Sequence, residues 1–133
     1  MSALVQAAVK ARLNSYSPYS KFKVGAALLD EHGNIHTGCN VENSAYPEGT
    51  CAEAGAIASM AISGARKIIE VAVVGAGSGL VTPCGGCRQK IREFAAPEVK
   101  IHVCDDSGNV RRTFTIEELL PSSFGPDNLD AVK

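Results

Sequence analysis

Apolar side chains recur along the 133-residue chain with spacings that change from segment to segment, and each spacing predicts a type of element. Residues 3–14 place apolar side chains every three or four positions, which predicts an amphipathic helix. Residues 22–29 alternate loosely between apolar and polar, and residues 35–39 return after a turn-forming segment, so the two predict neighbouring strands. Residues 51–63 again follow helical spacing and end before Gly64, a residue type common at helix C-termini.

The second half of the chain continues the succession of strands and helices. Residues 68–74 are apolar except for Glu70, a pattern typical of a strand that is buried on both faces. The pattern then predicts a helix at 84–94, strands at 99–104 and 110–114, and a short helix that starts with a capping box at Thr115 and ends at Pro121. This order predicts an α/β fold, a three-layer α-β-α sandwich with a central five-stranded mixed sheet. At this length we expect a single domain spanning residues 1–133.

Three thiols and one carboxylate lie in two short stretches that have the spacing of a metal site. Cys51 stands two residues before Glu53, and a Cys-x-x-Cys pair, Cys84 and Cys87, follows further along the chain. A catalytic zinc takes three protein ligands and leaves the fourth position to water, whereas a structural zinc takes four. Glu53 can lie beside the metal and accept a proton, which is the arrangement of zinc deaminases with a three-cysteine site.

The same stretches also have interpretations that require no catalysis. Thr50 and Glu53 fit a capping box, and such a box by itself is usually only a helix cap. Thr82, which is followed by a proline, is likewise predicted as the N-cap of the helix at 84–94. A lone Cys-x-x-Cys pair also fits a redox pair or half of a structural zinc site. The combination favours a catalytic zinc, and the unpaired N–H groups at the two helix starts are expected to favour thiolates.

Composition narrows the possible partners and the compartment. Thirteen basic and fourteen acidic residues give a net charge of −1, and aromatic residues make up 5%, so the basic groove and stacking rings of a nucleic-acid-editing deaminase are not expected. The five cysteines are odd in number and three belong to the predicted metal site, so a disulfide framework is not expected. Gln6, Lys10 and Arg12 interrupt the Ala-rich N-terminal stretch before a signal-peptide core forms, and no apolar run approaches the ~20 residues of a membrane span. We therefore expect a cytoplasmic protein without a nucleic-acid or membrane partner.

Beyond these patterns, the chain resembles the small three-cysteine cytidine deaminases from Tyr16 to Leu129. The resemblance is carried by Ser17-Pro18-Tyr19-Ser20-Lys21-Phe22, Val24-Gly25-Ala26-Ala27, Asn40-Val41-Glu42-Asn43, Cys51-Ala52-Glu53, Pro83-Cys84-Gly85-Gly86-Cys87-Arg88-Gln89 and Leu119-Leu120-Pro121. It implies hydrolytic deamination of cytidine and deoxycytidine to uridine and deoxyuridine with release of ammonia, a reaction of pyrimidine salvage. A deaminase of a modified cytosine nucleoside, such as a nucleoside antibiotic, and a structural zinc module are the alternatives.

The resemblance also implies roles for individual residues. Cys51, Cys84 and Cys87 would hold one Zn²⁺ per chain, and Glu53 would move protons. The implied substrate-binding residues are Phe22, Asn40, Glu42, Tyr46, Ala52 and Phe124. Asn40 and Glu42 would bind ribose hydroxyls, although ordinary loop polarity is an alternative interpretation of both. Members are commonly homotetramers with shared active sites, so Tyr46 and Phe124 would reach the site of a neighbouring subunit.

One position departs from the family pattern. Many members carry arginine directly after the catalytic glutamate, whereas this chain has Ala54. Three thiolates around Zn²⁺ sum to one negative charge, and that excess makes a bound water harder to ionise. We expect the two helix N-termini to offset this charge. Arg88 is a further candidate for the same role, although it also fits a solvated helix residue.

Overall fold

The computed structural model describes residues 1–130, and residues 131–133 of the predicted 1–133 domain lie outside the described residues. Its elements are α1 (Ala3–Arg12), β1 (Val24–Asp30), β2 (Ile35–Cys39), η1 (Tyr46–Glu48), α2 (Ala52–Ile62), β3 (Ile68–Gly75), α3 (Gly85–Phe94), β4 (Lys100–Cys104), β5 (Val110–Thr115), α4 (Ile116–Leu119) and α5 (Pro126–Asp130). The predicted helices and strands follow one another in the predicted order, and η1 and α5 are short additions. Within the described residues, no helix is long and apolar enough to cross a membrane.

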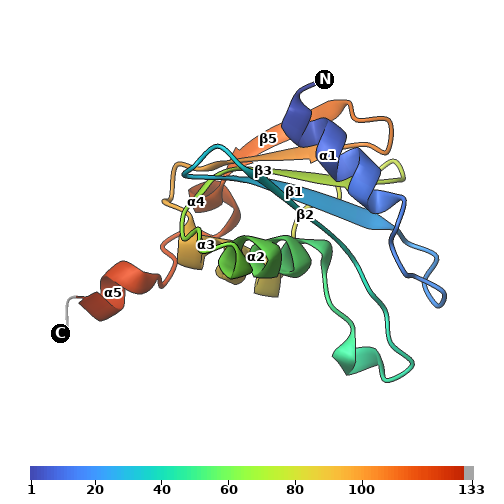
Figure 1. Ribbon diagram of the computed structural model, residues 1–133, viewed down its shortest axis with the longest axis horizontal. Coiled ribbons are helices and arrows are strands. Elements are labelled where there is room, and N and C mark those ends of the chain that lie inside the picture. The colour runs from blue at the N-terminus through green and yellow to red at the C-terminus, as the bar shows by residue number, and fades with distance from the viewer. Residues whose placement is uncertain (131–133) are drawn as a thin grey trace.

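The strands form one mixed sheet, which within residues 1–130 has five strands in the order β2-β1-β3-β4-β5. β3 and β4 run parallel, while the other neighbouring pairs are antiparallel. Helix α1 covers one face of the sheet, and α2 and α3 cover the other (Figure 1). This arrangement confirms the predicted three-layer sandwich with a central mixed sheet.

The central strand β3 has apolar side chains on both faces, which explains the unbroken apolar sequence of residues 71–74. Ala72 and Val74 pack with Ala8 of α1 on one side, whereas Val71 and Val73 pack with residues of α2 and α3 on the other. Successive side chains of a strand point to opposite faces, so a strand between two helical layers needs apolar residues at every position. Each fully buried valine contributes about 1.5–3 kcal/mol, which fixes both helical layers to the sheet.

The start of α2 lies directly against β2 because Gly38 has no side chain. A Cβ atom at Gly38 would lie 2.3 Å from the carbonyl oxygen of Ala52 and 2.5 Å from the backbone nitrogen of Ala56. Atoms this close would force the helix away from the strand, so glycine is required at this crossing. The close contact sets the position of the first turn of α2, which begins directly after Cys51.

Both predicted threonine caps are wrong. Cys51, not Thr50, is the N-cap of α2, and Cys84, not Thr82, is the N-cap of α3. The two cysteines have the extended backbone of N-cap residues, with ψ angles of 157° and 168°. The two thiols are directed toward each other across the gap between the helix starts. The capping box predicted at Thr115, at the start of α4, is confirmed.

Candidate active site

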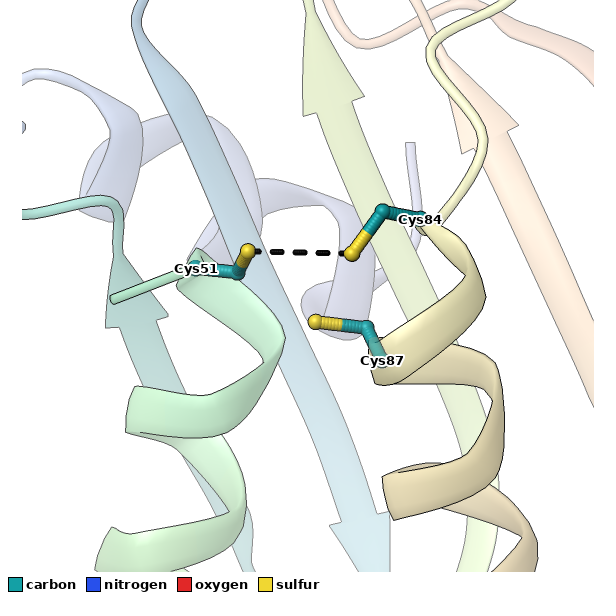
Figure 2. Close-up of side chains that lie close together, drawn as sticks. All are labelled: Cys51, Cys84 and Cys87. Atoms are coloured by element: carbon teal, nitrogen blue, oxygen red, sulfur yellow. Dashed lines mark hydrogen bonds between the residues drawn. The ribbon is translucent and has the colours of Figure 1, made fainter. Parts of the chain in front are cut away.

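The three predicted metal ligands come together at the starts of two neighbouring helices. Cys51 precedes the first turn of α2, Cys84 precedes that of α3, and Cys87 lies within the first turn of α3. Figure 2 shows the three side chains directed into the space between the two helices. Their sulfur atoms all lie within 4.8 Å of one another, and the Sγ atoms of Cys51 and Cys84 are 3.8 Å apart. The fold therefore makes one cluster of residues that are far apart in the sequence.

The cluster fits a tetrahedral zinc with thiolate ligands. Two sulfurs at the usual Zn–S distance of about 2.3 Å from one tetrahedral ion lie about 3.8 Å apart, which the separation of Cys51 and Cys84 matches. Among residues 1–130 the cluster has three members, and neither Cys39 nor Cys104 belongs to it. Three sulfurs leave one tetrahedral position open, as at a catalytic rather than a structural zinc.

The protonation of the thiols is set by burial and by the start of α3. The pKa of Cys84 is lowered, chiefly because the backbone N–H of Cys87 donates to its sulfur. Burial raises the pKa of Cys51, and burial together with the charge of Glu53 raises the pKa of Cys87. The lowered pKa of Cys84 agrees with the expectation that helix N-termini favour thiolates, whereas loss of water raises the pKa of the other two thiols. Those two thiols need the charge of a cation to ionise at neutral pH.

Glu53 adds a buried carboxyl group to this cluster. It lies in the first turn of α2, two residues after Cys51, and is 5% exposed. Burial raises the pKa of Glu53, while its own backbone N–H and the charge of Lys90 lower that pKa by smaller amounts. A carboxyl group with a raised pKa can both accept and donate a proton near neutral pH, which is the requirement for a general acid–base.

A cavity of about 340 Å³ opens beside the thiols and Glu53. Its lining contains the predicted residues Phe22, Asn40, Glu42, Tyr46, Cys51, Ala52, Glu53 and Cys84. The remaining described residues of the lining are Val24, Val41, Gly49, Thr50, Val81 and Thr82. The described lining thus carries two carboxylates and neither lysine nor arginine. Cys87 is buried, and Phe124, which lies between α4 and α5, is not among the described residues of this lining.

The side-chain amide of Asn40 ties together the backbone at the edge of the cavity. Its Oδ1 accepts hydrogen bonds from the N–H of Val24 at 2.9 Å and from the hydroxyl of Ser15, and its Nδ2 donates to the carbonyl of Phe22 at 2.8 Å. A side-chain amide has two N–H donors, so one of them remains for a ligand. Asn40 therefore fixes the backbone position of Phe22 and has one amide N–H left to donate to a ligand.

The carboxylate of Glu42 is held by the turn at Tyr19 and Ser20. Its Oε1 accepts from the N–H of Tyr19 at 3.0 Å and from that of Ser20 at 3.1 Å, and its Oε2 accepts from the hydroxyl of Ser20. These hydrogen bonds, with the Ser20 hydroxyl contributing most, hold the pKa of Glu42 below its usual value. A carboxylate has roughly four lone-pair positions, so an acceptor remains for a hydroxyl of a ligand.

Four residues that shape the cavity were not assigned to the site from the sequence. Thr50 and Thr82, predicted as helix caps, line the cavity. Tyr19 and Ser20 orient the carboxylate of Glu42. Tyr19 and Ser20 belong to the segment of residues 17–22, which carries part of the family resemblance, so the resemblance could have pointed to them. The two threonines left no separate signal, because threonine before a helix is ordinarily a cap.

Arg88 uses its donors on neighbouring oxygen atoms. Its Nε donates to the carbonyl of Pro83 at 2.7 Å, and its two terminal nitrogens donate to the carbonyl of Leu119 at 2.8 Å and to Oγ1 of Thr82 at 3.1 Å. The interpretation of Arg88 as a solvated helix residue is therefore wrong. Its contacts connect the start of α3 with the end of α4, rather than with the sulfur atoms.

The fold and the site together define the class of protein. Zinc-dependent deaminases place a glutamate, which is not a metal ligand, beside three cysteine or histidine ligands. Glu53 stands in this relation to the three thiols, at two helix starts on one face of a mixed sheet. The chain thus has the architecture and the donor set of the zinc-dependent deaminase class.

Comparison with known proteins narrows this class to one family. The family described as "Cytidine and deoxycytidylate deaminase zinc-binding region" matches residues 1–103. A cytidine deaminase of Sporosarcina psychrophila is 44% identical over 126 residues, which cover 95% of this chain and 92% of that protein. The crystal structure of cytidine deaminase from Burkholderia pseudomallei has a TM-score of 0.86 at 41% identity, covering 93% of this chain and 100% of that one. The structure from Mycobacterium tuberculosis has a TM-score of 0.80 at 35% identity, covering 92% and 94%. The chain belongs to the cytidine deaminase family.

Proposed function

We propose that this protein hydrolyses cytidine and deoxycytidine to uridine and deoxyuridine with release of ammonia, a reaction of pyrimidine salvage. The observation that carries the proposal is the buried carboxyl group of Glu53 beside a cluster of three sulfur atoms in one cavity. Membership of the cytidine deaminase family supports it, since relatives that share most of this chain bear that name.

In this proposal Cys51, Cys84 and Cys87 hold one Zn²⁺ per chain, and the bound ion supplies the Lewis acidity that activates water at neutral pH. Glu53 accepts a proton from the attacking water and delivers it to N3 of the cytosine ring as the C4–O bond forms. The carboxylate then takes the proton of the new C4 hydroxyl group and passes it to the amino group, so that the C4–N bond breaks, the C4 carbonyl of the product forms and ammonia leaves. The raised pKa of Glu53 suits this role, because the same group must alternately hold and release a proton.

The cavity supports a nucleoside rather than a nucleotide as the substrate. Its volume of about 340 Å³ is at the small end of the range for ligand pockets. The carboxylates of Glu42 and Glu53 face the cavity, and its described lining offers neither lysine nor arginine to a phosphate group. A phosphate would therefore be repelled without compensation. Phe22 and Ala52 contribute apolar surface for the base, and Asn40 and Glu42 retain a donor and an acceptor for ribose hydroxyls.

An ultraviolet assay of the purified protein with a panel of cytosine compounds tests the proposal. The panel contains cytidine, deoxycytidine, cytosine, cytidine monophosphate and a cytosine-containing oligonucleotide. We expect turnover of both nucleosides and a kcat/KM for the monophosphate that is lower by roughly 100-fold, because its charge is uncompensated. Preferential turnover of the monophosphate or the oligonucleotide would contradict the proposal. A higher kcat/KM for a modified cytosine nucleoside would favour the alternative of a nucleoside-antibiotic deaminase.

We also propose that the working unit is a homotetramer in which subunits complete one another's active sites. Phe124 supports this proposal, because its ring is 58% exposed on the segment between α4 and α5. Ile62, at the end of α2, is 89% exposed and adds apolar surface. Aromatic side chains are enriched at the surfaces through which proteins associate. Tyr46, implied for a neighbouring site, also lines the cavity of its own chain, whereas Phe124 is not among the described lining residues, so Phe124 is the clearer test of a shared site.

Mixing two defective variants is expected to restore activity if sites are shared. Phe124→Ala chains keep Glu53, and Glu53→Gln chains keep Phe124, so a mixed tetramer contains sites that have both. After subunit exchange, we expect kcat/KM per intact Glu53 to rise toward the wild-type value. The matched control is the double variant Glu53→Gln/Phe124→Ala, which has no ring to contribute and should give no rescue. Failure of the first mixture to recover, or a monomer mass in light scattering of the wild type, would end the proposal.

An arginine at position 54 is expected to move the acid limb of the pH–activity profile to lower pH. Ala54 is half-buried in the first turn of α2, beside Glu53. Burial raises the pKa of Glu53, so proton acceptance is lost at a higher pH than for an ordinary glutamate. An added positive charge favours the ionised carboxylate and lowers that pKa. The pH dependence of kcat/KM for cytidine measures the shift, with Ala54→Gln as the neutral control. An unchanged profile in zinc-loaded Ala54→Arg would show that other groups already offset the excess negative charge of the three thiolates.

A further inference from the structure

Helix α3 holds the C-terminal segment through two side chains that lie beyond its metal-site end. Nε2 of Gln89 donates to the carbonyl of Phe124 at 2.9 Å. Nε of Arg92 donates to Oγ of Ser123 at 3.0 Å, and its Nη2 donates to Oδ1 of Asp127 at 2.9 Å. These contacts fall on Phe124 itself and on residues to either side of it. The backbone is therefore held at the point from which the aromatic ring extends.

The guanidinium group of Arg92 is buried under this segment. Arg92 is 7% exposed, and a Cβ atom at Gly125 would lie 2.5 Å from its Cζ, so the backbone of Gly125 rests directly on the guanidinium. Nη1 also donates to the carbonyl of Ala95, at 3.4 Å. A buried charged group needs partners for its donors, and the C-terminal segment supplies two of these three acceptors, on Ser123 and Asp127. Loss of the planar guanidinium would thus separate the segment from α3.

The segment that is held in this way presents its aromatic ring to solvent. Phe124 is 58% exposed, and Leu129 of α5 is 55% exposed. Figure 1 shows α5 projecting away from the sheet and from the helices packed on it. If these contacts served only to stabilise the chain end, the ring of Phe124 would be expected to be buried, because burial of an aromatic ring would add most to the stability of the segment. An ordered backbone with an exposed ring is instead prepared for contact with another molecule, because the cost of ordering it is already met.

We propose that Arg92 and Gln89 are positioning residues, which hold residues 123–130 against α3 in one orientation and thereby place the ring of Phe124 in a neighbouring subunit's active site. This inference rests on the proposed function, in which Phe124 completes that site. Cys84 and Cys87 stand at the start of the same helix, so the ring is tied to the helix that carries the metal ligands of its own chain.

The variant Arg92→Lys tests the proposal. Lysine keeps the charge but has no planar fork, so its ammonium group does not hold Ser123 and Asp127 in the same geometry. We expect KM for cytidine to rise roughly three- to tenfold, the weight of one aromatic contact, with kcat, zinc content and oligomer mass unchanged. Asp127→Asn removes only the charge of an exposed partner and should raise KM by a smaller factor. It keeps the proposal testable if Arg92→Lys fails to fold.

A double-variant comparison separates positioning from stability. In the Phe124→Ala background, Arg92→Lys is expected to leave KM unchanged, because it acts through the missing ring. Additive effects on KM, or a lowered Tm with wild-type KM in the single variant, would overturn the proposal. Arg111→Lys is the matched control, since that guanidinium also donates to backbone carbonyls, those of residues 77–79, and it should leave KM unchanged.

Two outcomes separate this inference from the proposed function. A Phe124→Ala variant with wild-type KM would overturn the positioning role, while turnover of cytidine by the wild type would leave the proposed reaction standing. Absence of cytidine turnover by the zinc-loaded wild type would overturn both.

Discussion

Glu53→Gln is expected to keep the fold and the zinc and to lose most of the turnover of cytidine. Glutamine preserves the length and shape of the side chain in the first turn of α2, but its amide does not carry a proton between water, N3 and the amino group. Loss of a general acid–base costs ~10²–10⁴-fold, and a group that serves several transfers is expected at the upper end. The measurement is kcat for cytidine in the ultraviolet assay, together with the zinc content of the same sample.

A matched substitution controls for the loss of a carboxylate. Glu93→Gln makes the same chemical change at an exposed position of α3, and we expect wild-type turnover from it. If Glu53→Gln kept near-normal turnover with full zinc, the buried carboxyl group would have no part in proton transfer. Loss of zinc from Glu53→Gln would instead mean that Glu53 contributes to holding the metal.

Cys84→Ala is expected to empty the metal site and to abolish activity. Cys84 is the thiol of the cluster whose pKa is lowered, whereas burial raises the pKa of Cys51 and of Cys87. The variant therefore loses the ligand that ionises most readily and keeps two that are protonated at neutral pH. Since the free energy of zinc binding by thiolates depends on their ionisation, we expect less than about a tenth of a zinc per chain in protein purified without added metal. Elemental analysis gives the metal content.

Cys104→Ala is the control for removing a thiol. Cys104 is buried among residues of α1 and the sheet, and burial raises its pKa to about 11, so its thiol is neutral at physiological pH. We expect this variant to retain a full complement of zinc, with a modest loss of stability from the missing sulfur. Full zinc and full activity in Cys84→Ala would remove that residue from the metal site.

The order of the longer helices and strands was predictable because each pattern is contained within one element. The apolar run at 68–74 predicted β3, and the capping box at Thr115 predicted the start of α4. The exact first residues of α2 and α3 were harder to predict. Thr50 and Cys51 are adjacent, and residue type alone does not determine the backbone angles that decide which of them is the N-cap of α2. Helix α5 is short and polar and is held by Arg92 of α3, so no local pattern indicated it.

By itself the sequence determined the chemistry available to this protein: three thiols and one carboxylate, in two short stretches that each lie at a helix start. Only the tertiary structure decided that Glu53 is buried, that Asn40 and Glu42 use most of their hydrogen-bonding capacity on residues 15–24, and that Arg92 holds the C-terminal segment. The reason is physical. Helical and strand periodicity depend on neighbours within a few positions, whereas burial, pKa shifts and hydrogen-bond partners depend on groups that the order of the sheet brings together from distant parts of the chain.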